Sequence, residues 1–380
     1  MISEGSRLAI YGDDDFTRLI VEQIKLTSLY RISFIISTEK KSFCGFDCYT
    51  LEDLKDRIRE IDDILIVEQM PFKNDKIFEL HENGINDCYI LNKESQTYFD
   101  EFGRFNMGAI QHYRLDEKPV LRYLETHLVD YCNLKCKGCT HFANICQEPG
   151  FVNVVDYEKQ LAQLSNLCDV AILRLMGGEP FLHPDLIEVF TKTRSYFPRA
   201  QIFIVTNGLL IDSLKEEICK SIVDNRIIVN ISPYPQTVNK REKIESFLIR
   251  NGILFFWGNG ERYLDSSCII NSFHTCLSPT VQGVPGHLNC YNKYCWFLRD
   301  GFLSKCAYPQ MIFLLNDTFN AGFNVKQEDL VNIFTQNDGW KIIKKMNSPM
   351  PFCYYCSSHT REFIWESGGT PKLSDYYVYI

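Results

Sequence analysis

The chain has 380 residues, enough for two or three domains, and its 45% hydrophobic and 23% charged residues are ordinary for a globular protein. A net charge of −8 argues against a general nucleic-acid or membrane-surface binder, because both need a positive footprint. We expect no membrane span, since no segment reaches about 18 uninterrupted apolar residues. The residues after Met1 lack the apolar run of a signal peptide, which predicts a cytoplasmic location.

Residues 1–95 are predicted to form a Rossmann-like α/β domain, because strand and helix patterns alternate along them. The expected strands are 8–11, 32–36, 64–67 and 88–91, and the expected helices are 16–24, 51–59 and 77–82. A dinucleotide fingerprint would have glycines where Asp14 and Phe16 stand. Three successive carboxylates would repel a pyrophosphate, so we predict a degenerate fingerprint without NAD binding. Residues 96–120 show no clear period and are interpreted as a linker.

A second alternating series occupies residues 121–260. Its expected strands are 124–129, 170–176, 202–206, 227–231 and 253–256, separated by helices near 155–167, 184–196, 213–223 and 240–250. Five strand–helix repeats indicate a parallel barrel or an open part of one. Residues 261–380 break into short cysteine-bearing pieces, with a hairpin predicted at 296–305 around the Asp300-Gly301 turn.

The sixteen cysteines of this large chain favour metal ligation over disulfides, since no export signal is apparent. Cys132-Asn-Leu-Lys-Cys136-Lys-Gly-Cys139 directly follows the first strand of the second series. Three thiolates at this spacing can fold around an iron–sulfur cubane and leave one iron without a protein ligand. The triplet alone leaves two alternatives open: structural cysteines, or a zinc site with Cys146 as the fourth ligand.

Polar residues and glycines also mark the ends of the next three strands. They are Met176-Gly177-Gly178-Glu179-Pro180, Thr206-Asn207-Gly208 and Asn230-Ile231-Ser232. Glycines let a ligand approach the backbone closely, and a carboxylate can accept from an ammonium group. Each segment alone is compatible with turn chemistry. Because parallel sheets bind ligands at the carboxyl ends of their strands, the ordered set favours one site.

The Cys-x3-Cys-x2-Cys and Gly-Gly-Glu-Pro motifs resemble those of the radical S-adenosylmethionine (SAM) superfamily, over roughly residues 122–258. The resemblance implies an α/β fold with a partial (β/α)6 barrel. It also implies a [4Fe–4S] cluster on Cys132, Cys136 and Cys139, with SAM bound at the open iron. Reductive cleavage of SAM would give a 5′-deoxyadenosyl radical, chemistry that no side chain can supply.

The same resemblance assigns the SAM-binding residues. The methionine part of SAM would be held at Gly177, Gly178, Glu179 and Pro180, with Asn207 and Ser232 near the ribose or the substrate. One departure is Gly138, because many members carry an aromatic residue before the third cysteine, near the adenine. This departure concerns the adenine contact and not the cluster.

The carboxy-terminal cysteines resemble the auxiliary-cluster region of SPASM/twitch enzymes. Cys290 is followed by ten residues, Gly301, four residues and Cys306, and a distant Cys-x2-Cys is formed by Cys353 and Cys356. No cysteine follows Cys356, which implies a single auxiliary [4Fe–4S] cluster on these four cysteines. A zinc knuckle or unligated buried thiols remain alternatives.

Three further cysteines lie in irregular segments predicted near the barrel mouth: Cys268, Cys276 and Cys295. Cys295 also competes with Cys290 as an auxiliary ligand, because it too precedes Gly301. A thiol near the mouth could give a hydrogen atom to a substrate radical, since an S–H bond is weaker than most C–H bonds. The alternative is simple packing, which is common for free cysteine.

The favoured interpretation is a radical SAM oxidoreductase or epimerase that abstracts hydrogen from a carbohydrate- or nucleotide-linked small molecule. A flavodoxin- or ferredoxin-type electron donor is the expected partner, with no nucleic acid and no membrane. Maturation of a ribosomally made peptide ranks lower, because no leader-binding winged helix is visible. The alternative of another class is a non-catalytic zinc or iron–sulfur scaffold, against which the Gly177-Gly178-Glu179 motif argues.

Overall fold

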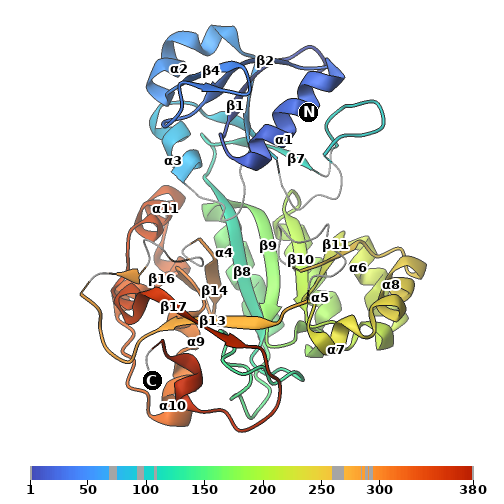
Figure 1. Ribbon diagram of the computed structural model, residues 1–380, viewed down its shortest axis with the longest axis vertical. Helices are drawn as coiled ribbons and strands as arrows, with labels where there is room; N and C mark the ends of the chain where they lie inside the picture. Colours follow the sequence, from blue (N-terminus) through green and yellow to red (C-terminus); the bar gives the residue numbers. More distant parts are fainter. Residues whose placement is uncertain are drawn as a thin grey trace. The chain divides into compact units, whose positions relative to one another are not determined.

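The computed structural model describes residues 2–67, 75–91, 98–106, 109–258, 269–283, 285–286, 290 and 294–378. They form two compact units (Figure 1). The first unit comprises residues 1–122 with 338–347, and the second comprises 123–337 with 348–380. Both are built on largely parallel sheets with helices between successive strands, which confirms the predicted α/β class.

The first unit contains a seven-stranded sheet of order β3-β4-β2-β1-β5-β6-β7. The pairs β4-β2-β1-β5-β6 are parallel, whereas β3 and β7 are antiparallel to their neighbours. β7 lies in the segment that showed no sequence period. The elements are β1 (Arg7–Tyr11), α1 (Asp15–Thr27), β2 (Arg31–Ile36), β3 (Ser42–Phe43), β4 (Phe46–Tyr49), α2 (Leu51–Arg57), β5 (Asp63–Ile66), α3 (Asp75–Glu82), β6 (Asp87–Leu91) and β7 (Ile110–Arg114).

The acidic turn after β1 has a structural role, because its residues cap and pack the helix that follows. Asp14 is the N-cap of α1 and accepts from both the backbone N–H and the hydroxyl of Thr17 at 2.7 Å. A Cβ atom on Gly12 would lie 2.1 Å from the carbonyl oxygen of Val67, so only glycine fits there. Later in the chain, α11 (Gly339–Asn347) joins this unit by packing on α3, with Trp340 stacked on His81 at 3.8 Å between ring centroids.

The second unit contains an eight-stranded sheet of order β12-β11-β10-β9-β8-β14-β15-β16. Strands β12 to β8 and β14 are mutually parallel, and β15 and β16 continue antiparallel. β8 begins in the first unit. The strands are β8 (Val120–Val129), β9 (Asp169–Gly177), β10 (Gln201–Thr206), β11 (Ile227–Ile231), β12 (Phe255–Trp257), β14 (Trp296–Arg299), β15 (Phe302–Ser304) and β16 (Val331–Asn332).

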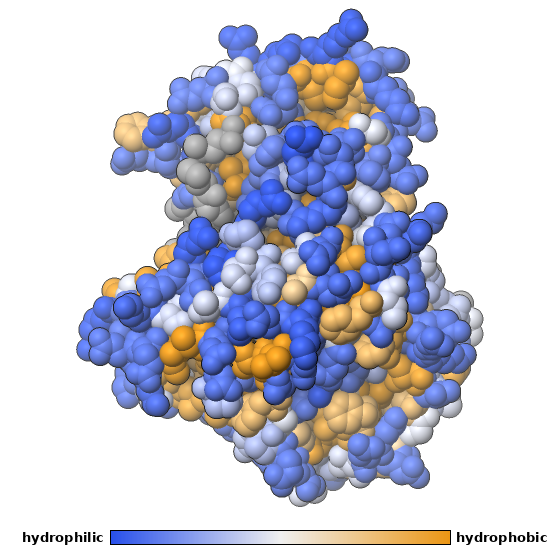
Figure 2. All heavy atoms as spheres, turned by 180° about the vertical axis from the view of Figure 1, so that it is seen from behind, coloured by the Kyte–Doolittle hydropathy of each residue, from blue (hydrophilic) through white to orange (hydrophobic). Residues whose placement is uncertain are grey.

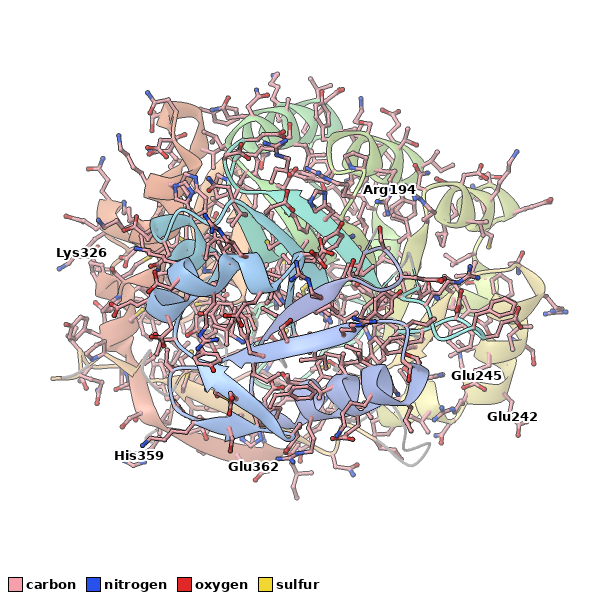
Figure 3. The ribbon with its side chains drawn as sticks, turned by 90° about the horizontal axis from the view of Figure 1, so that it is seen from above. Arg194, Glu242, Glu245, Lys326, His359 and Glu362 are labelled. Carbon is pink, nitrogen blue, oxygen red and sulfur yellow. The ribbon has the colours of Figure 1, made fainter. Side chains whose placement is uncertain are left out.

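Helices connect the parallel strands at the places that the periodicity predicted. They are α4 (Val154–Leu167), α5 (Leu186–Tyr196), α6 (Glu216–Asp224), α7 (Pro235–Val238) and α8 (Arg241–Arg250). Arg194, at the end of α5 (Figure 3), donates to backbone carbonyls that include those of Ala200 and Asn225, both at 2.8 Å. It thereby fixes the ends of α5 and α6 beside the start of β10.

The hairpin β14–β15 extends the sheet on the far side of β8. Trp296 pairs with Leu124 and Phe297 with Glu125 in parallel register. Asp300 and Gly301 form the predicted turn with φ angles of 50° and 78°, as a tight two-residue hairpin requires. The cysteine-bearing region is therefore continuous with the barrel-type sheet.

A separate two-stranded antiparallel ribbon is formed by β13 (Ser272–Leu277) and β17 (Cys356–Ile364), which lie side by side in Figure 1. Short elements pack nearby: α9 (Tyr308–Met311), α10 (Phe313–Phe319) and 3-10 turns at Pro351–Tyr355 and Leu373–Tyr376. The face in Figure 2 is largely hydrophilic, with hydrophobic patches between the polar side chains. Among the helices that the structure describes, none has the length and apolar character needed to cross a bilayer.

Candidate active site

The cysteine triplet lies in the loop that follows β8. Cys132 and Cys136 are buried, with 7% and 6% of their surface exposed, and Cys139 is half-buried. The sulfur of Cys132 accepts from the backbone N–H of Leu134 at 3.3 Å and from the amide of Asn207 at 3.5 Å. Burial raises the pKa of the Cys132 thiol to about 12. A bound cation would therefore be needed to hold it as a thiolate.

The third cysteine faces a turn of backbone donors. Burial raises the pKa of the Cys139 thiol, and the backbone N–H groups of residues 141–144 act in the opposite direction. Such converging N–H groups favour an anionic sulfur. The three thiols are close enough that a charge on Cys132 or Cys139 raises the pKa of Cys136. The donor set thus suits a negatively charged thiolate cluster.

The glycine pair at the end of β9 lies against the start of this loop. A Cβ atom on Gly177 would approach the carbonyl oxygen of Val129 to 2.4 Å, and one on Gly178 would approach that of Tyr131 to 2.0 Å. The backbone N–H of Gly178 donates to the Val129 carbonyl at 2.6 Å. Close backbone contact is therefore the structural reason for both glycines, and Pro180 then starts a 3-10 turn.

Glu179 is fully buried, and its carboxylate accepts three hydrogen bonds within the chain. The donors are the N–H of Phe181 at 3.1 Å, the hydroxyl of Thr206 at 2.8 Å and the N–H of Asn207 at 2.9 Å. Burial raises the pKa of Glu179 to about 7, against the effect of these donors. In this structure the carboxylate ties the end of β9 to the end of β10, and its contact with SAM stays a prediction.

Two other predicted residues have defined surroundings. The amide of Asn207 donates to the side chain of Asn133 at 2.7 Å as well as to Cys132, so it faces the cysteine loop. Ser232 is half-buried just after β11 and pairs through its N–H with the Thr206 carbonyl at 2.9 Å. Their predicted contacts with the ribose or the substrate stay predictions.

The absence of an aromatic residue at position 138 has a structural cause. Gly138 has a φ of +63°, and a Cβ there would lie 2.3 Å from the ring of Phe363. The ring of a residue in β17 therefore occupies the space that a side chain at position 138 would need. The sequence motif could not reveal this substitution, because the two positions are more than 200 residues apart.

The alternative fourth ligand of a zinc site lies elsewhere. The thiol of Cys146 donates to the carbonyl of Glu148 at 3.0 Å, and the charges that act on its pKa include Asp130 and Arg299. Within the described residues, no group of three or more His, Cys, Asp or Glu side chains converges closely enough to hold a single metal ion. The described cysteines are all free of disulfides.

The carboxy-terminal cysteines gather around Tyr308. Burial raises the pKa of this tyrosine well above its usual value, and charges on Cys276, Cys290, Cys306 and Cys356 act in the same direction. Cys276 and Cys356 share a hydrogen bond that lowers the pKa of the first and raises that of the second. Sequence reasoning had not placed Cys276 among these thiols; its position opposite β17 in the ribbon is a long-range pairing.

Cys353 belongs to the same region but has different neighbours. Burial raises the pKa of its thiol, and the nearby charges are those of Lys305 and Asp329. A charge on Cys353 also acts on Cys306. Five thiols therefore lie in this region, whereas a fully ligated [4Fe–4S] cluster needs four. They are those of Cys276, Cys290, Cys306, Cys353 and Cys356.

The three candidate hydrogen donors separate in the structure. Cys268 lies outside the described residues, and Cys276 lies with the auxiliary thiols. Cys295 is buried enough that its pKa is raised well above the usual value, and the charged groups acting on it are Glu125, Arg174 and its rival as auxiliary ligand, Cys290. Cys295 alone of the two described candidates thus neighbours the interior of the barrel-type sheet.

That interior carries a polar set which the sequence reasoning missed. The hydroxyl of Tyr123 donates to Glu125 at 2.8 Å, and Arg174 donates to the amide oxygen of Asn230 at 3.1 Å. The guanidinium of Arg174 lies 5.4 Å from the centre of the Tyr123 ring. All four side chains are at most 8% exposed and come from β8, β9 and β11. In the sequence they lie within strand segments, and no local pattern shows that the fold brings them together.

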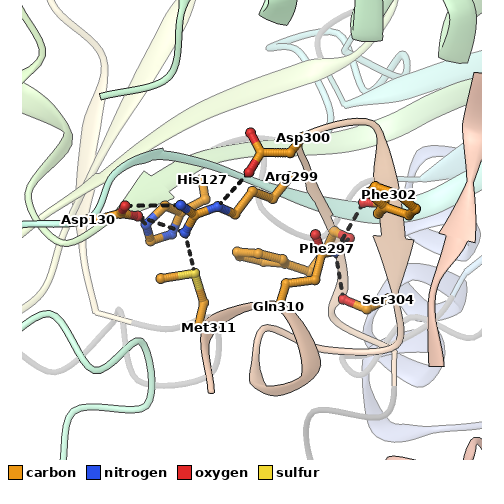
Figure 4. A network of polar contacts seen from close by, with 9 residues as sticks. All are labelled: His127, Asp130, Phe297, Arg299, Asp300, Phe302, Ser304, Gln310 and Met311. Atoms are coloured by element: carbon orange, nitrogen blue, oxygen red, sulfur yellow. Dashed lines mark hydrogen bonds and ion pairs between the residues drawn. The ribbon is translucent and has the colours of Figure 1, made fainter. Parts of the chain in front are cut away.

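The sheet and the β14–β15 hairpin are joined by an ion pair next to the cysteine loop (Figure 4). Arg299 donates to both carboxylate oxygens of Asp130, at 2.7 and 2.9 Å, and the two side chains are only 17% and 14% exposed. His127 contacts the same carboxylate at 2.7 Å, and burial lowers the pKa of this histidine. Asp130 thus holds the end of β8 and β14 together.

A pH dependence is expected from Glu125, whose pKa burial raises to about 7. Between about pH 4.5 and 7 the folded chain keeps a proton that the unfolded chain has released, so this carboxyl's stabilisation is lost as the pH rises. Glu125→Gln should therefore gain stability relative to the native chain across that window, as measured by thermal denaturation of the metal-free proteins. Glu242→Gln, on the exposed face of α8 (Figure 3), is the control and should follow the native curve.

Comparison with known proteins gives one family match and several distant relatives. The model of the radical SAM superfamily matches residues 127–256. GTP 3′,8-cyclase of Microcystis aeruginosa is 32% identical over 100 residues, which are 25% of this chain and 30% of that protein. Molybdenum cofactor biosynthesis protein 1 of Drosophila melanogaster is 30% identical over 131 residues, 34% of this chain and 22% of that protein. The chain thus spans less than a third of the length of these two.

A longer match is found to GTP 3′,8-cyclase of Clostridium botulinum (strain Okra), 29% identical over 263 residues, which cover 65% of this chain and 79% of that protein. Among solved structures, BtrN in complex with AdoMet and 2-DOIA has a TM-score of 0.34 at 18% identity, covering 60% of this chain and 87% of that one. Native anSMEcpe with bound AdoMet has a TM-score of 0.30 at 20% identity, covering 37% and 43%.

Proposed function

We propose that this chain is a radical SAM enzyme, since the radical SAM superfamily model matches residues 127–256, and that Cys132, Cys136 and Cys139 hold its SAM-binding [4Fe–4S] cluster. The observation that carries the assignment is the convergence of the three thiols with backbone and amide N–H donors in the loop after β8. When bound, the cluster and SAM supply a 5′-deoxyadenosyl radical, which abstracts a hydrogen atom from the substrate.

The protein's own part is to hold and shield these groups. Gly177 and Gly178 let the end of β9 pack directly on the backbone at the start of the cysteine loop, and the buried carboxylate of Glu179 keeps the ends of β9 and β10 in place. Asn207 links β10 to Cys132 directly. SAM would lie across these strand ends, with Ser232 at the far side, just after β11.

The substrate is proposed to be a polar small molecule, carbohydrate- or nucleotide-linked. Support comes from the buried polar set of Tyr123, Glu125, Arg174 and Asn230, whose hydrogen-bonding groups suit hydroxyl, amine or phosphate groups. Two relatives are named GTP 3′,8-cyclase, that is, enzymes that act on a nucleotide, and this supports the same substrate class. Hydrogen abstraction would be followed by dehydrogenation if the substrate radical loses a proton and passes its electron to an auxiliary cluster, or by epimerisation if Cys295 returns a hydrogen atom.

An auxiliary [4Fe–4S] cluster is proposed at the thiols around Tyr308. Cys290, Cys306 and Cys356 are proposed as ligands, with support from the sequence pattern and from their mutual proximity. The structure supports Cys276 over Cys353 as the fourth ligand, because Cys276 is hydrogen-bonded to Cys356.

Iron analysis distinguishes these two cysteines. After anaerobic reconstitution, the native chain should bind about eight irons, four for each cluster. Cys276→Ala should fall to about four irons, whereas Cys353→Ala, an equal loss of one thiol in the same region, should stay near eight. The reverse result would restore Cys353 as the fourth ligand.

The function is tested by incubating the reconstituted chain with SAM and dithionite under anaerobic conditions. We expect 5′-deoxyadenosine, formed faster when the correct substrate is present. Nucleotides, nucleotide-sugars, aminosugars and peptides should be compared with SAM deuterium exchange as the readout of hydrogen abstraction. Stimulation by peptides alone would favour the peptide-maturase alternative, and zinc without 5′-deoxyadenosine would favour the scaffold.

We also propose a cytoplasmic location and a flavodoxin- or ferredoxin-type electron donor. Support for both comes from the chemistry: the cluster needs a low-potential one-electron reductant and reduced thiols. Replacement of dithionite by reduced flavodoxin or ferredoxin should sustain 5′-deoxyadenosine formation. If neither supports turnover, this partner assignment is wrong.

A further inference from the structure

The chain segment after β17 runs along the cysteine loop. Cys136 forms an isolated antiparallel bridge with Ser367, and the N–H of Lys137 donates to the carbonyl of Glu366 at 2.9 Å. The side chains of Lys137 and Glu366 also form an ion pair at 3.1 Å. The side chains just before position 367 are therefore held at a fixed place over Cys136.

Trp365 is the large side chain at that place. It is 9% exposed and belongs to one buried cluster with Cys132, Leu134, Cys136 and Ala143. Its indole N–H is shielded from solvent and meets no acceptor of ordinary hydrogen-bond geometry within the described residues. A buried donor without an acceptor is destabilising, so its orientation needs a reason.

A second aromatic side chain stands beside it. Tyr234, which follows β11, stacks on Trp365 with ring centroids 5.3 Å apart and an interplanar angle of 27°. Tyr234 also packs against the buried cluster that contains Trp365 and Cys136. Two aromatic side chains with hydrogen-bond donors, one just after β17 and one after β11, therefore lie against the cluster that contains Cys136.

We propose that Trp365 and Tyr234 are positioning residues of the SAM-binding cluster, donating an N–H and an O–H to the Cys136 sulfur and raising the reduction potential of the cluster. The inference rests on the proposed function, since it needs a cluster on Cys136. Donors to a ligating sulfur stabilise the reduced cluster, which carries one more electron, and so make that electron easier to accept from the donor protein. The stacked rings also keep water from the sulfur.

The test compares Trp365→Phe, Tyr234→Phe and the double variant with the native chain. The electron paramagnetic resonance signal that changes on addition of SAM identifies the cluster with the open iron. Its midpoint potential should be lower in each single variant and lowest in the double variant, with the iron content unchanged. Trp257→Phe is the matched control, because Trp257 donates its indole N–H to Glu245 at 2.9 Å, and its potential should equal the native one.

A second measurement does not depend on the stability of the variants. In the native chain with ¹⁵N-indole-labelled tryptophan, the SAM-responsive signal should show a ¹⁵N hyperfine coupling. Equal midpoint potentials in all chains, or no such coupling, would overturn the inference while leaving the cluster in place. A native chain without any SAM-responsive signal would instead refute the proposed function.

Discussion

Cys136→Ala is expected to abolish SAM-dependent formation of 5′-deoxyadenosine. Three thiolates are the only protein ligands proposed for this cluster, so each loss leaves two. Mutation of groups that merely support metal ligands costs about 10- to 100-fold, and loss of a ligand should exceed that. The measurement is chromatographic quantification of 5′-deoxyadenosine after anaerobic incubation with SAM and dithionite, together with iron analysis.

Cys219→Ala is the matched control for this loss of a buried thiol. Cys219 lies on α6 and is 3% exposed, so its removal perturbs packing without touching the cysteine loop. It should retain the native iron content and activity. Native-like activity in Cys136→Ala would show that the triplet is not the radical-generating site.

Asp130→Asn should destabilise the chain by about 3–5 kcal/mol, because it leaves the buried guanidinium of Arg299 with only the exposed carboxylate of Asp300 as a charged partner. The pair is bidentate and largely shielded from solvent, unlike a surface salt bridge. Since it joins the end of β8 to β14, its loss should also loosen the cysteine loop that begins two residues later. Urea denaturation of the metal-free chain, followed by circular dichroism, measures the effect.

Two further variants separate charge from packing at this pair. Asp130→Leu with Arg299→Met removes both charges and should recover most of the stability, as apolar replacement of buried ion pairs commonly does. Asp156→Asn breaks an exposed pair with Lys159 and should cost about 1 kcal/mol or less. If Asp130→Asn unfolds at the native urea concentration, the pair does not hold the hairpin.

Much of the fold was predictable because its elements are encoded locally. The strands β8 to β12 and the helices between them follow from hydrophobic periodicity, and the Asp300-Gly301 turn follows from its dipeptide. The cysteine triplet was visible because its ligands lie within eight residues. In each case the information sits inside a short window of the chain.

The features that escaped prediction depend on residues far apart in sequence. The pairing of β14 with β8 joins Trp296 to Leu124, and no local pattern announces it. Cys276 reaches the auxiliary thiols only through the ribbon, and the tight fit at Gly138 depends on Phe363. Glu125 and Arg174 come from different strands, and only the fold brings their charges close enough to act on each other.

The contact between the cysteine loop and the segment after β17 also sets an order of events during synthesis. The two residues of the Lys137–Glu366 pair are 229 positions apart. At about 5–20 residues per second, a ribosome needs roughly 10 to 45 s to make the intervening chain. During that interval the loop has emerged without its aromatic cover, and assembly factors have open access to its thiols. Once the segment after β17 has packed on the loop, the same contact should slow the loss of a cluster from the loop.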